Sequence, residues 1–258
     1  NSGSIFVQIS DENLHRVRLV MDEVFGAENF IAQIVFQKTT GASGKLLGAT
    51  SDFLLWYAKD YSRVKYRQVF FHKEALGVGG KGYSKKLLDD GSEADLDFLS
   101  SNLTSDGNIF ALDNITSQRP AQGEDVGEYM FRGRVCTPGK GTFKTDKRGL
   151  DKLFGAGRLG LLGNTLRYVR FLDDFRVSPY TNLWTDTTIA GFAADKIYVV
   201  QTTPKVIERC LLMTTDPGDL VLDPTCGSGT TAYVAEQWGR RWITIDTSRV
   251  ALALARQR

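Results

Sequence analysis

The 258-residue sequence is poor in the residue types that build metal and disulfide sites. It contains two histidines and three cysteines, and the cysteines are widely spaced, with no CxxC pair. They are Cys136, Cys210 and Cys226. An odd, scattered set of cysteines predicts neither a disulfide framework nor a zinc cluster. We therefore expect no metal site.

Long apolar runs are also missing. No uninterrupted apolar stretch approaches the ~18 residues that a membrane-spanning helix needs. The first residues, NSGSIFVQISDE, lack the basic and apolar regions of a signal peptide. These absences predict a soluble, cytoplasmic protein that makes no membrane contact. The formal net charge of +2 excludes little by itself, so the distribution of charge is more informative.

Shorter apolar segments are present and predict regular structure in the first 60 residues. Apolar, β-branched runs at residues 4–9, 30–36 and 53–58 predict three strands. Between the first two, apolar side chains at three- and four-residue spacing predict a helix that begins near Ser10 and ends at Gly26.

The middle of the chain separates charge of opposite sign. Residues 89–128 are acidic and loop-like, whereas residues 132–170 carry ten Lys and Arg residues against two Asp residues, an excess of eight positive charges. A charge run is often only a solvated surface. Here aromatic residues interleave with the cations, which favours nucleic acid, because phosphate contacts position a protein while aromatic or polar groups touch bases.

The most informative stretch is LVLDPTCGSGTTA, residues 220–232. It predicts a strand, a glycine turn and the start of a helix, and helix amides at such a turn favour a negative group. Asp246 lies 23 residues beyond Asp223, close to the ~20-residue offset at which an acid binds a ribose diol. The pattern predicts a nucleoside ligand. It also fits the GxGxxG/A fingerprint of NAD enzymes, although only 12 residues follow Asp246. The remaining strands are therefore expected upstream, in a permuted order.

That order, with DPTCGSGT near the end, resembles the beta-class amino-methyltransferases of DNA, and most closely the modification subunits of type III restriction systems. GSIFVQISDENLHRVRLVMDEVFGAENF, SDFLLWYAKD and KIYVVQTTPKVIERCLLMTT are similar to other core segments of the family. The resemblance implies an α/β fold: a three-layer, Rossmann-like methyltransferase core in permuted order. Residues 1–60 and 186–258 would form the core and residues 61–185 a target-recognition insert.

The resemblance also implies a cofactor, S-adenosylmethionine, and the residues that hold it. Asp223, Thr225, Gly227, Ser228 and Gly229 would line its methionine end, and Asp246 would hold its ribose. Gln201 is carried over from a TQKP-like stretch that reads VQTT here, with Thr202 in place of the family lysine. Cys226 is expected to be a small buried filler.

The expected partner of the insert is double-stranded DNA, and the family makes a restriction subunit and a homodimer plausible partners as well. The candidate DNA-binding residues are Arg132, Arg134, Lys140, Lys144, Lys147 and Arg148. The resemblance implies a site-specific methyltransferase acting on an exocyclic base amine, adenine N6, within a restriction-modification system.

One family motif is missing. These enzymes accept hydrogen bonds from the flipped base amine with a D/N/S-P-P-Y/F/W loop, and the sequence contains no such string. The nearest is SPYT at residues 178–181, which a turn inside the insert explains more simply. We therefore name no catalytic residue and expect a fragment that begins after this loop and is inactive alone. Two alternatives stay open: a non-catalytic DNA-binding module and an NAD-binding oxidoreductase.

Overall fold

The computed structural model describes residues 2–42, 46–88, 91–96, 108–123, 125–188 and 202–258. The chain divides into two compact units. The core unit combines Asn1–Val69 with Pro179–Arg258, and the inserted unit is Phe70–Ser178. The boundaries predicted from the sequence were residues 60 and 185, whereas this division falls after Val69 and after Ser178.

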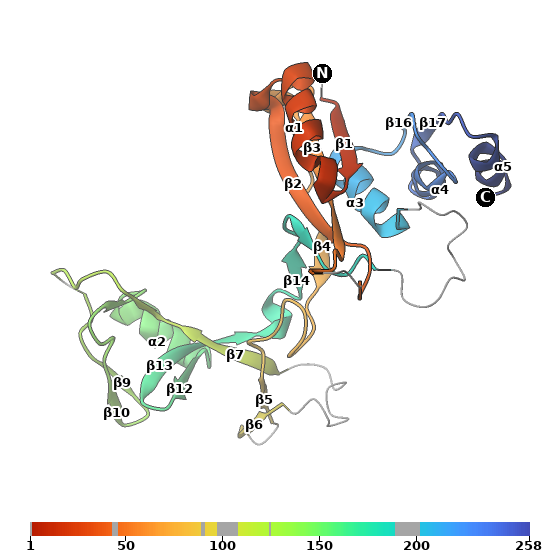
Figure 1. The fold of residues 1–258 in the computed structure, drawn as a ribbon. Helices are drawn as coiled ribbons and strands as arrows, with labels where there is room; N and C mark the ends of the chain where they lie inside the picture. The colour runs from red at the N-terminus through yellow and green to blue at the C-terminus, as the bar shows by residue number, and fades with distance from the viewer. Residues whose placement is uncertain (1, 43–45, 89–90, 97–107, 124, 189–201) are drawn as a thin grey trace. The chain divides into compact units, whose positions relative to one another are not determined.

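A four-stranded sheet of order β1-β3-β2-β15 forms one part of the core unit (Figure 1). Its strands are β1 (Ser4–Ile9), β2 (Phe30–Gln37), β3 (Ser51–Ala58) and β15 (Leu183–Trp184). β3 pairs antiparallel with both β1 and β2, whereas β15 runs parallel to β2. The three strands predicted from apolar runs are confirmed as β1, β2 and β3. Their sequences are apolar because each strand alternates its side chains between two faces that are both covered by helices.

Helices cover both faces of this sheet. The helix α1 (Asp11–Phe25) packs Met21 against Leu55 and Tyr57. On the opposite face, α3 (Pro204–Thr214) packs against a cluster that contains Leu54. The predicted end of α1 is confirmed, since Gly26 has φ +84° and its amide caps the helix. Short 3-10 helices, η1 (Ala27–Asn29) and η2 (Tyr61–Arg63), complete this part.

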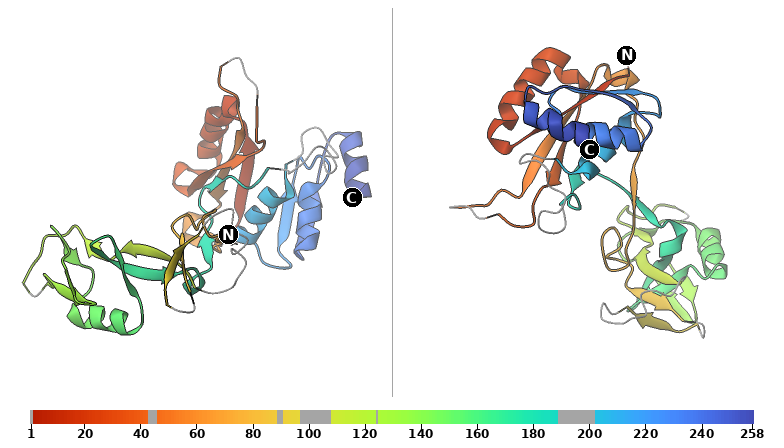
Figure 2. Two further views of the ribbon diagram at one scale, coloured as in Figure 1. Left: turned by 90° about the horizontal axis from the view of Figure 1, so that it is seen from below. Right: turned by 90° about the vertical axis from the view of Figure 1, so that its right-hand side faces the viewer.

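The second part of the core unit is a parallel pair of strands, β16 (Leu220–Asp223) and β17 (Arg241–Thr244). The helix α4 (Thr230–Gln237) connects them, and α5 (Arg249–Gln257) follows β17 (Figure 2). On one face of the pair, Val221 packs against α3 and α4. The other face is apolar and exposed to solvent. It carries the exposed side chains of Leu220, Leu222, Ile243 and Ile245, which we call the open face, beside Arg241, the register partner of Leu220.

The inserted unit is built on a five-stranded sheet of order β12-β13-β7-β5-β6. Its strands are β5 (Lys85–Leu87), β6 (Glu93–Asp95), β7 (Ile109–Asn114), β12 (Leu159–Leu162) and β13 (Thr165–Phe171). The remaining elements are β4 (Phe70–His72), β8 (Thr116–Ser117), β9 (Tyr129–Phe131), β10 (Arg134–Cys136), β11 (Thr142–Phe143), α2 (Lys147–Gly155), η4 (Leu172–Asp174) and β14 (Val177–Pro179). The core of this unit surrounds Leu150 and Leu166, which are fully buried.

One expectation for this region is wrong. Residues 89–128 are not simply loop-like, because β7 lies within them and pairs with β13 and β5. Phe110 of β7 is fully buried. The acidic composition of the surrounding segment hid this strand, since only alternate residues of a strand face the core.

Candidate functional site

The predicted glycine turn is present between β16 and α4. Gly227 has φ +53° and Gly229 has φ +79°, conformations that L side chains rarely adopt. Gly229 is the N-cap of α4, and an added Cβ there would lie 2.9 Å from the Cβ of Ala255. The turn therefore needs glycine at this position for backbone conformation and for its close approach to α5.

Two carboxylates hold this turn. Asp223 accepts hydrogen bonds from the Thr225 amide at 3.0 Å and from the Thr231 hydroxyl at 2.5 Å. Asp246 accepts from the Gly227 amide at 2.8 Å and from the Ser248 amide at 2.8 Å. These backbone donors, Ser248 first and Gly227 second, lower the pKa of the Asp246 carboxyl. Both acids are therefore parts of the turn's framework.

A cavity of about 700 Å³ opens beside the turn, within the ~300–1,000 Å³ typical of small-molecule sites. Four of the predicted cofactor residues line it: Asp223, Thr225, Gly227 and Ser228. Gly229 and Asp246 do not line it, and Gln201 lies outside the described residues. The structure thus brings most of the predicted set to one wall.

The other walls come from β1 and α3, which sequence reasoning did not assign to the site. Gln8 of β1 lines the cavity, and its side-chain oxygen accepts a hydrogen bond from the Thr202 hydroxyl at 2.5 Å. Thr202 stands at the position of the family lysine. A polar Gln8 within the apolar run SIFVQI was the signal that could have identified this wall.

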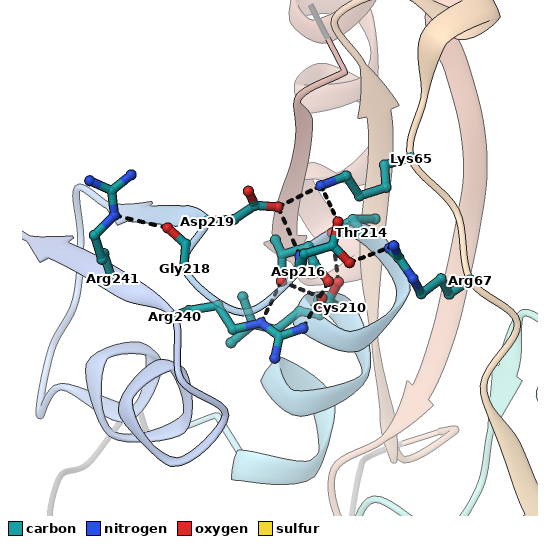
Figure 3. A network of polar contacts seen from close by, with 11 residues as sticks. Lys65, Arg67, Cys210, Thr214, Asp216, Gly218, Asp219, Arg240 and Arg241 are labelled. Atoms are coloured by element: carbon teal, nitrogen blue, oxygen red, sulfur yellow. Dashed lines mark hydrogen bonds and ion pairs between the residues drawn. The ribbon is translucent and has the colours of Figure 1, made fainter.

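An ionic network ties the β16–β17 pair to the rest of the core unit (Figure 3). The Lys65 ammonium contacts Asp216 and Asp219, each at 2.6 Å, just before β16. Arg67 also contacts Asp216, at 2.5 Å. Hydrogen bonding to Lys65 lowers the pKa of both carboxyls. The network fixes the entry of the chain into β16 and so the position of the turn.

Cys226, inside the turn, is buried as expected. Its thiol contacts the Gly227 carbonyl oxygen at 3.7 Å. Burial raises the pKa of the thiol, which keeps it protonated and disfavours nucleophilic chemistry.

The basic residues of the inserted unit fall into two groups. Arg158 pairs with Asp174 at 2.6 Å, and Arg170 pairs with Asp113 at 2.8 Å. The six predicted DNA-binding residues are all exposed, and no carboxylate in the described ranges forms an ion pair with any of them. They are Arg132, Arg134, Lys140, Lys144, Lys147 and Arg148. No ion pair with a described carboxylate neutralises these six, and the same holds for Lys152 and Arg167 of the positive segment.

Tyr180 of the SPYT string packs against Arg209. The Arg209 guanidinium lies 3.7 Å from the centre of its ring, and its hydroxyl accepts a hydrogen bond from Arg209 at 2.7 Å. Arg209 also contacts Asp186, at 2.6 Å. A ring face covered by Arg209 is poorly placed to stack on a base, which favours the turn interpretation of this string.

The described residues contain no group of three or more His, Cys, Asp or Glu side chains that could hold a metal ion. They also contain no helix of the length and hydropathy required to cross a membrane.

Two solved structures match nearly the whole chain at low sequence identity. The PvuII cytosine-N4-specific DNA methyltransferase matches with a TM-score of 0.48 at 12% identity, over 99% of this chain and 63% of the other. The M1.HpyAVI–SAM complex matches with a TM-score of 0.44 at 13% identity, over 99% and 74%.

Sequence comparisons show the family. The type II methyltransferase M.EcaI of Enterobacter cloacae is 27% identical over 97% of this chain and 52% of its own length, so the chain spans about half of that relative. The type II methyltransferase M2.DpnII of Streptococcus pneumoniae is 49% identical over 53 residues, 20% of each chain. A family model described as DNA methylase, of the N6 and N4 type, matches residues 1–257. This match covers nearly the whole sequence, and the chain therefore belongs to the N6/N4 DNA methylase family.

Proposed function

We propose that this chain carries the S-adenosylmethionine site and the DNA-recognition unit of a methyltransferase that modifies an exocyclic amine of a DNA base. Family membership supports the reaction class, and it favours neither the oxidoreductase nor the non-catalytic alternative. The observation that carries the choice of cofactor is the pair of carboxylates at the turn.

The charge of the turn fits a cationic ligand. In NAD enzymes the free amides of such a turn receive a pyrophosphate. Here the Gly227 amide already donates to Asp246, and Asp223 faces the cavity with a second negative charge. Two carboxylates repel a pyrophosphate and attract a sulfonium. The donor set thus fits S-adenosylmethionine better than a dinucleotide.

The residues of this chain would bind and orient the cofactor. Bound there, it supplies a methyl group on a positively charged sulfur. Asp223, Thr225, Gly227 and Ser228 would hold the methionine end against α4. Asp246 would fix the turn from behind, and its remaining lone pairs would be available to the ribose diol.

The inserted unit would bind the DNA. The six unpaired basic residues offer positive charge to phosphates, and two of them, Lys147 and Arg148, lie in the first turn of α2. The finer assignments are proposals as well: adenine N6 as the target, a restriction-modification role, a restriction subunit as partner and a homodimer. They are supported by the resemblance to type III modification subunits, whereas the relatives described above are type II methyltransferases.

Calorimetric binding of S-adenosylhomocysteine, beside NADH, tests the cofactor site. We expect binding of the first ligand and none of the second, and the reverse result would contradict the proposal. The site variant is Thr225→Val, because the Thr225 side chain is exposed and lines the cavity. The matched control is Thr247→Val, which makes the same change at an exposed residue that does not line the cavity. Equal loss of binding in both variants would show that the cavity is not the site.

A further inference from the structure

The strands β9 and β10 form a short two-stranded ribbon in the inserted unit (Figure 1). Arg132 and Gly133 connect them, with φ +47° and φ +79°. Positive φ at both central residues defines the type I′ hairpin turn, whose twist matches that of the flanking strands. The ribbon is therefore a regular hairpin with Arg132 at its tip.

The inner side of the ribbon is anchored. Tyr129, Phe131 and Cys136 are buried in the cluster around Leu150. The Tyr129 hydroxyl donates a hydrogen bond to Asp151 of α2 at 3.1 Å. This packing holds the ribbon against α2 and fixes which of its side chains face the solvent.

The outer side is apolar and exposed. Met130 and Val135 are partners across the two strands, and they are 62% and 55% exposed. Side chains of adjacent residues alternate between faces, so these two project away from the buried Phe131. A rigid apolar pair in water beside an arginine tip has the character of a contact surface.

The conformation of Arg132 adds a second observation. Asn or Gly adopts the positive φ of this turn at less steric cost than a residue with a long side chain. Arg132 is exposed, and no carboxylate of the described residues forms an ion pair with it. Its guanidinium lies 5.3 Å from the centre of the Phe131 ring and is exposed, so it packs on the hairpin and remains accessible to a partner.

We propose that the β9–β10 ribbon enters the major groove of double-stranded DNA and reads base identity there. This inference rests on the proposed function, and it adds the residues that determine sequence specificity. The major groove admits a two-stranded ribbon, and it presents guanine O6 and N7 to arginine and thymine methyl groups to apolar side chains. Arg132 contacts a guanine edge, and Met130 with Val135 contacts a thymine methyl. The local positive charge selects DNA over an apolar protein surface.

Selection from a randomised duplex library, read by sequencing, tests this role. The first variant is Arg132→Gly, which removes the guanidinium and retains a residue suited to positive φ, so the fold is preserved. The second is Met130→Ser with Val135→Ser, on a face that makes no contribution to the core. The matched control is Lys147→Ala, a basic residue outside the ribbon. Salt-dependent affinity for a fixed duplex is measured in parallel.

The wild type is expected to enrich a motif. Arg132→Gly should lose preference at a guanine position and the double variant at a thymine position, each by roughly tenfold or more for the affected base pair. Lys147→Ala should lower affinity for all sequences and leave the motif unchanged. The ribbon assignment alone would be overturned if the ribbon variants enriched the same motif as the wild type. It would also be overturned if the wild type bound DNA without enriching any motif. Failure of the wild type to bind any duplex would overturn this inference together with the proposed DNA substrate.

Discussion

The carboxylate of Asp246 accepts a hydrogen bond from the backbone amide of Gly227 at 2.8 Å. A residue two positions beyond the end of β17 thereby holds the turn that follows β16. Asp246 was expected from its spacing to bind a ribose, and the structure adds that it supports the turn. Substitution of Asp246 therefore tests both its role in binding a ligand and its role in supporting the turn.

Asp246→Ala is expected to weaken binding of S-adenosylhomocysteine by roughly tenfold or more, because the Gly227 amide loses its acceptor and the turn loosens. Asp246→Asn retains one acceptor oxygen and should give an intermediate loss. Calorimetry on both variants, with thermal unfolding as a check on the fold, measures the effect. Wild-type affinity in Asp246→Ala would show that neither role is needed.

Gly229→Ala is expected to lower the free energy of unfolding by about 2–4 kcal/mol, since it combines an unfavourable φ with a clash against Ala255. Gly218→Ala is the control. Gly218 has φ +84°, and an added Cβ there would meet nothing within 4 Å, so its cost should be about 1–2 kcal/mol. Denaturant unfolding of both variants isolates the clash, and equal losses would contradict the close approach to α5.

Replacing Lys147 and Arg148 with alanine should make the dependence of DNA affinity on salt shallower by about two units of slope, because fewer counterions are released per complex. The control exchanges the ion pair of Arg170 and Asp113 for Gln and Asn, which leaves net charge unchanged. Its slope should stay at the wild-type value. Titrations at several salt concentrations check both, and an unchanged slope in the alanine variant would remove the start of α2 from the interface.

Asp186 should contribute acid-sensitive stability. Burial raises the pKa of this carboxyl, but the Arg209 and Lys205 side chains together outweigh burial and hold the pKa at about 2, below its ordinary value of 3.8. Its contribution is therefore fully present above about pH 4 and is lost as the pH falls toward 2. Asp186→Asn should lower the free energy of unfolding by about 1–2 kcal/mol at neutral pH, a value discounted because Asp186 is 40% exposed.

Unfolding measured from pH 6 to pH 2 tests this assignment. The difference between wild type and Asp186→Asn should shrink across the acid range, because the wild type loses its charge there as well. Glu208→Gln, in α3 beside Arg209, is the control for removal of a carboxylate that forms no ion pair with the described residues. A constant difference at all pH values would contradict the ion pair with Arg209.

The core unit was largely predictable because its elements carry local signals. The runs at β1, β2 and β3 and the cap at Gly26 each specify their element within a few residues. The inserted unit was not predictable to this extent. Several of its strands are two or three residues long, and they pair with segments far away in the sequence, as Thr142 does with Ser117. Strands of this length have too few residues to show a period.

In the candidate site, too, local features were predictable from the sequence and long-range contacts were not. Spacing identified Asp223 and Asp246 but not the hydrogen bond that joins Asp246 to Gly227. The excess of positive charge was visible in the sequence, whereas the pairing of Arg158 with Asp174 is a tertiary contact. Only the structure separates the cations that are already neutralised from those that are available to a partner.

The open face of the β16–β17 pair also affects how the protein behaves in solution. Leu222 and Ile243 lie side by side in it, because they are register partners, and Leu222 is 60% exposed. A contiguous apolar surface of this kind promotes association at high protein concentration and binds hydrophobic dyes. Colloidal stability and the geometry of the glycine turn therefore depend on the same two strands.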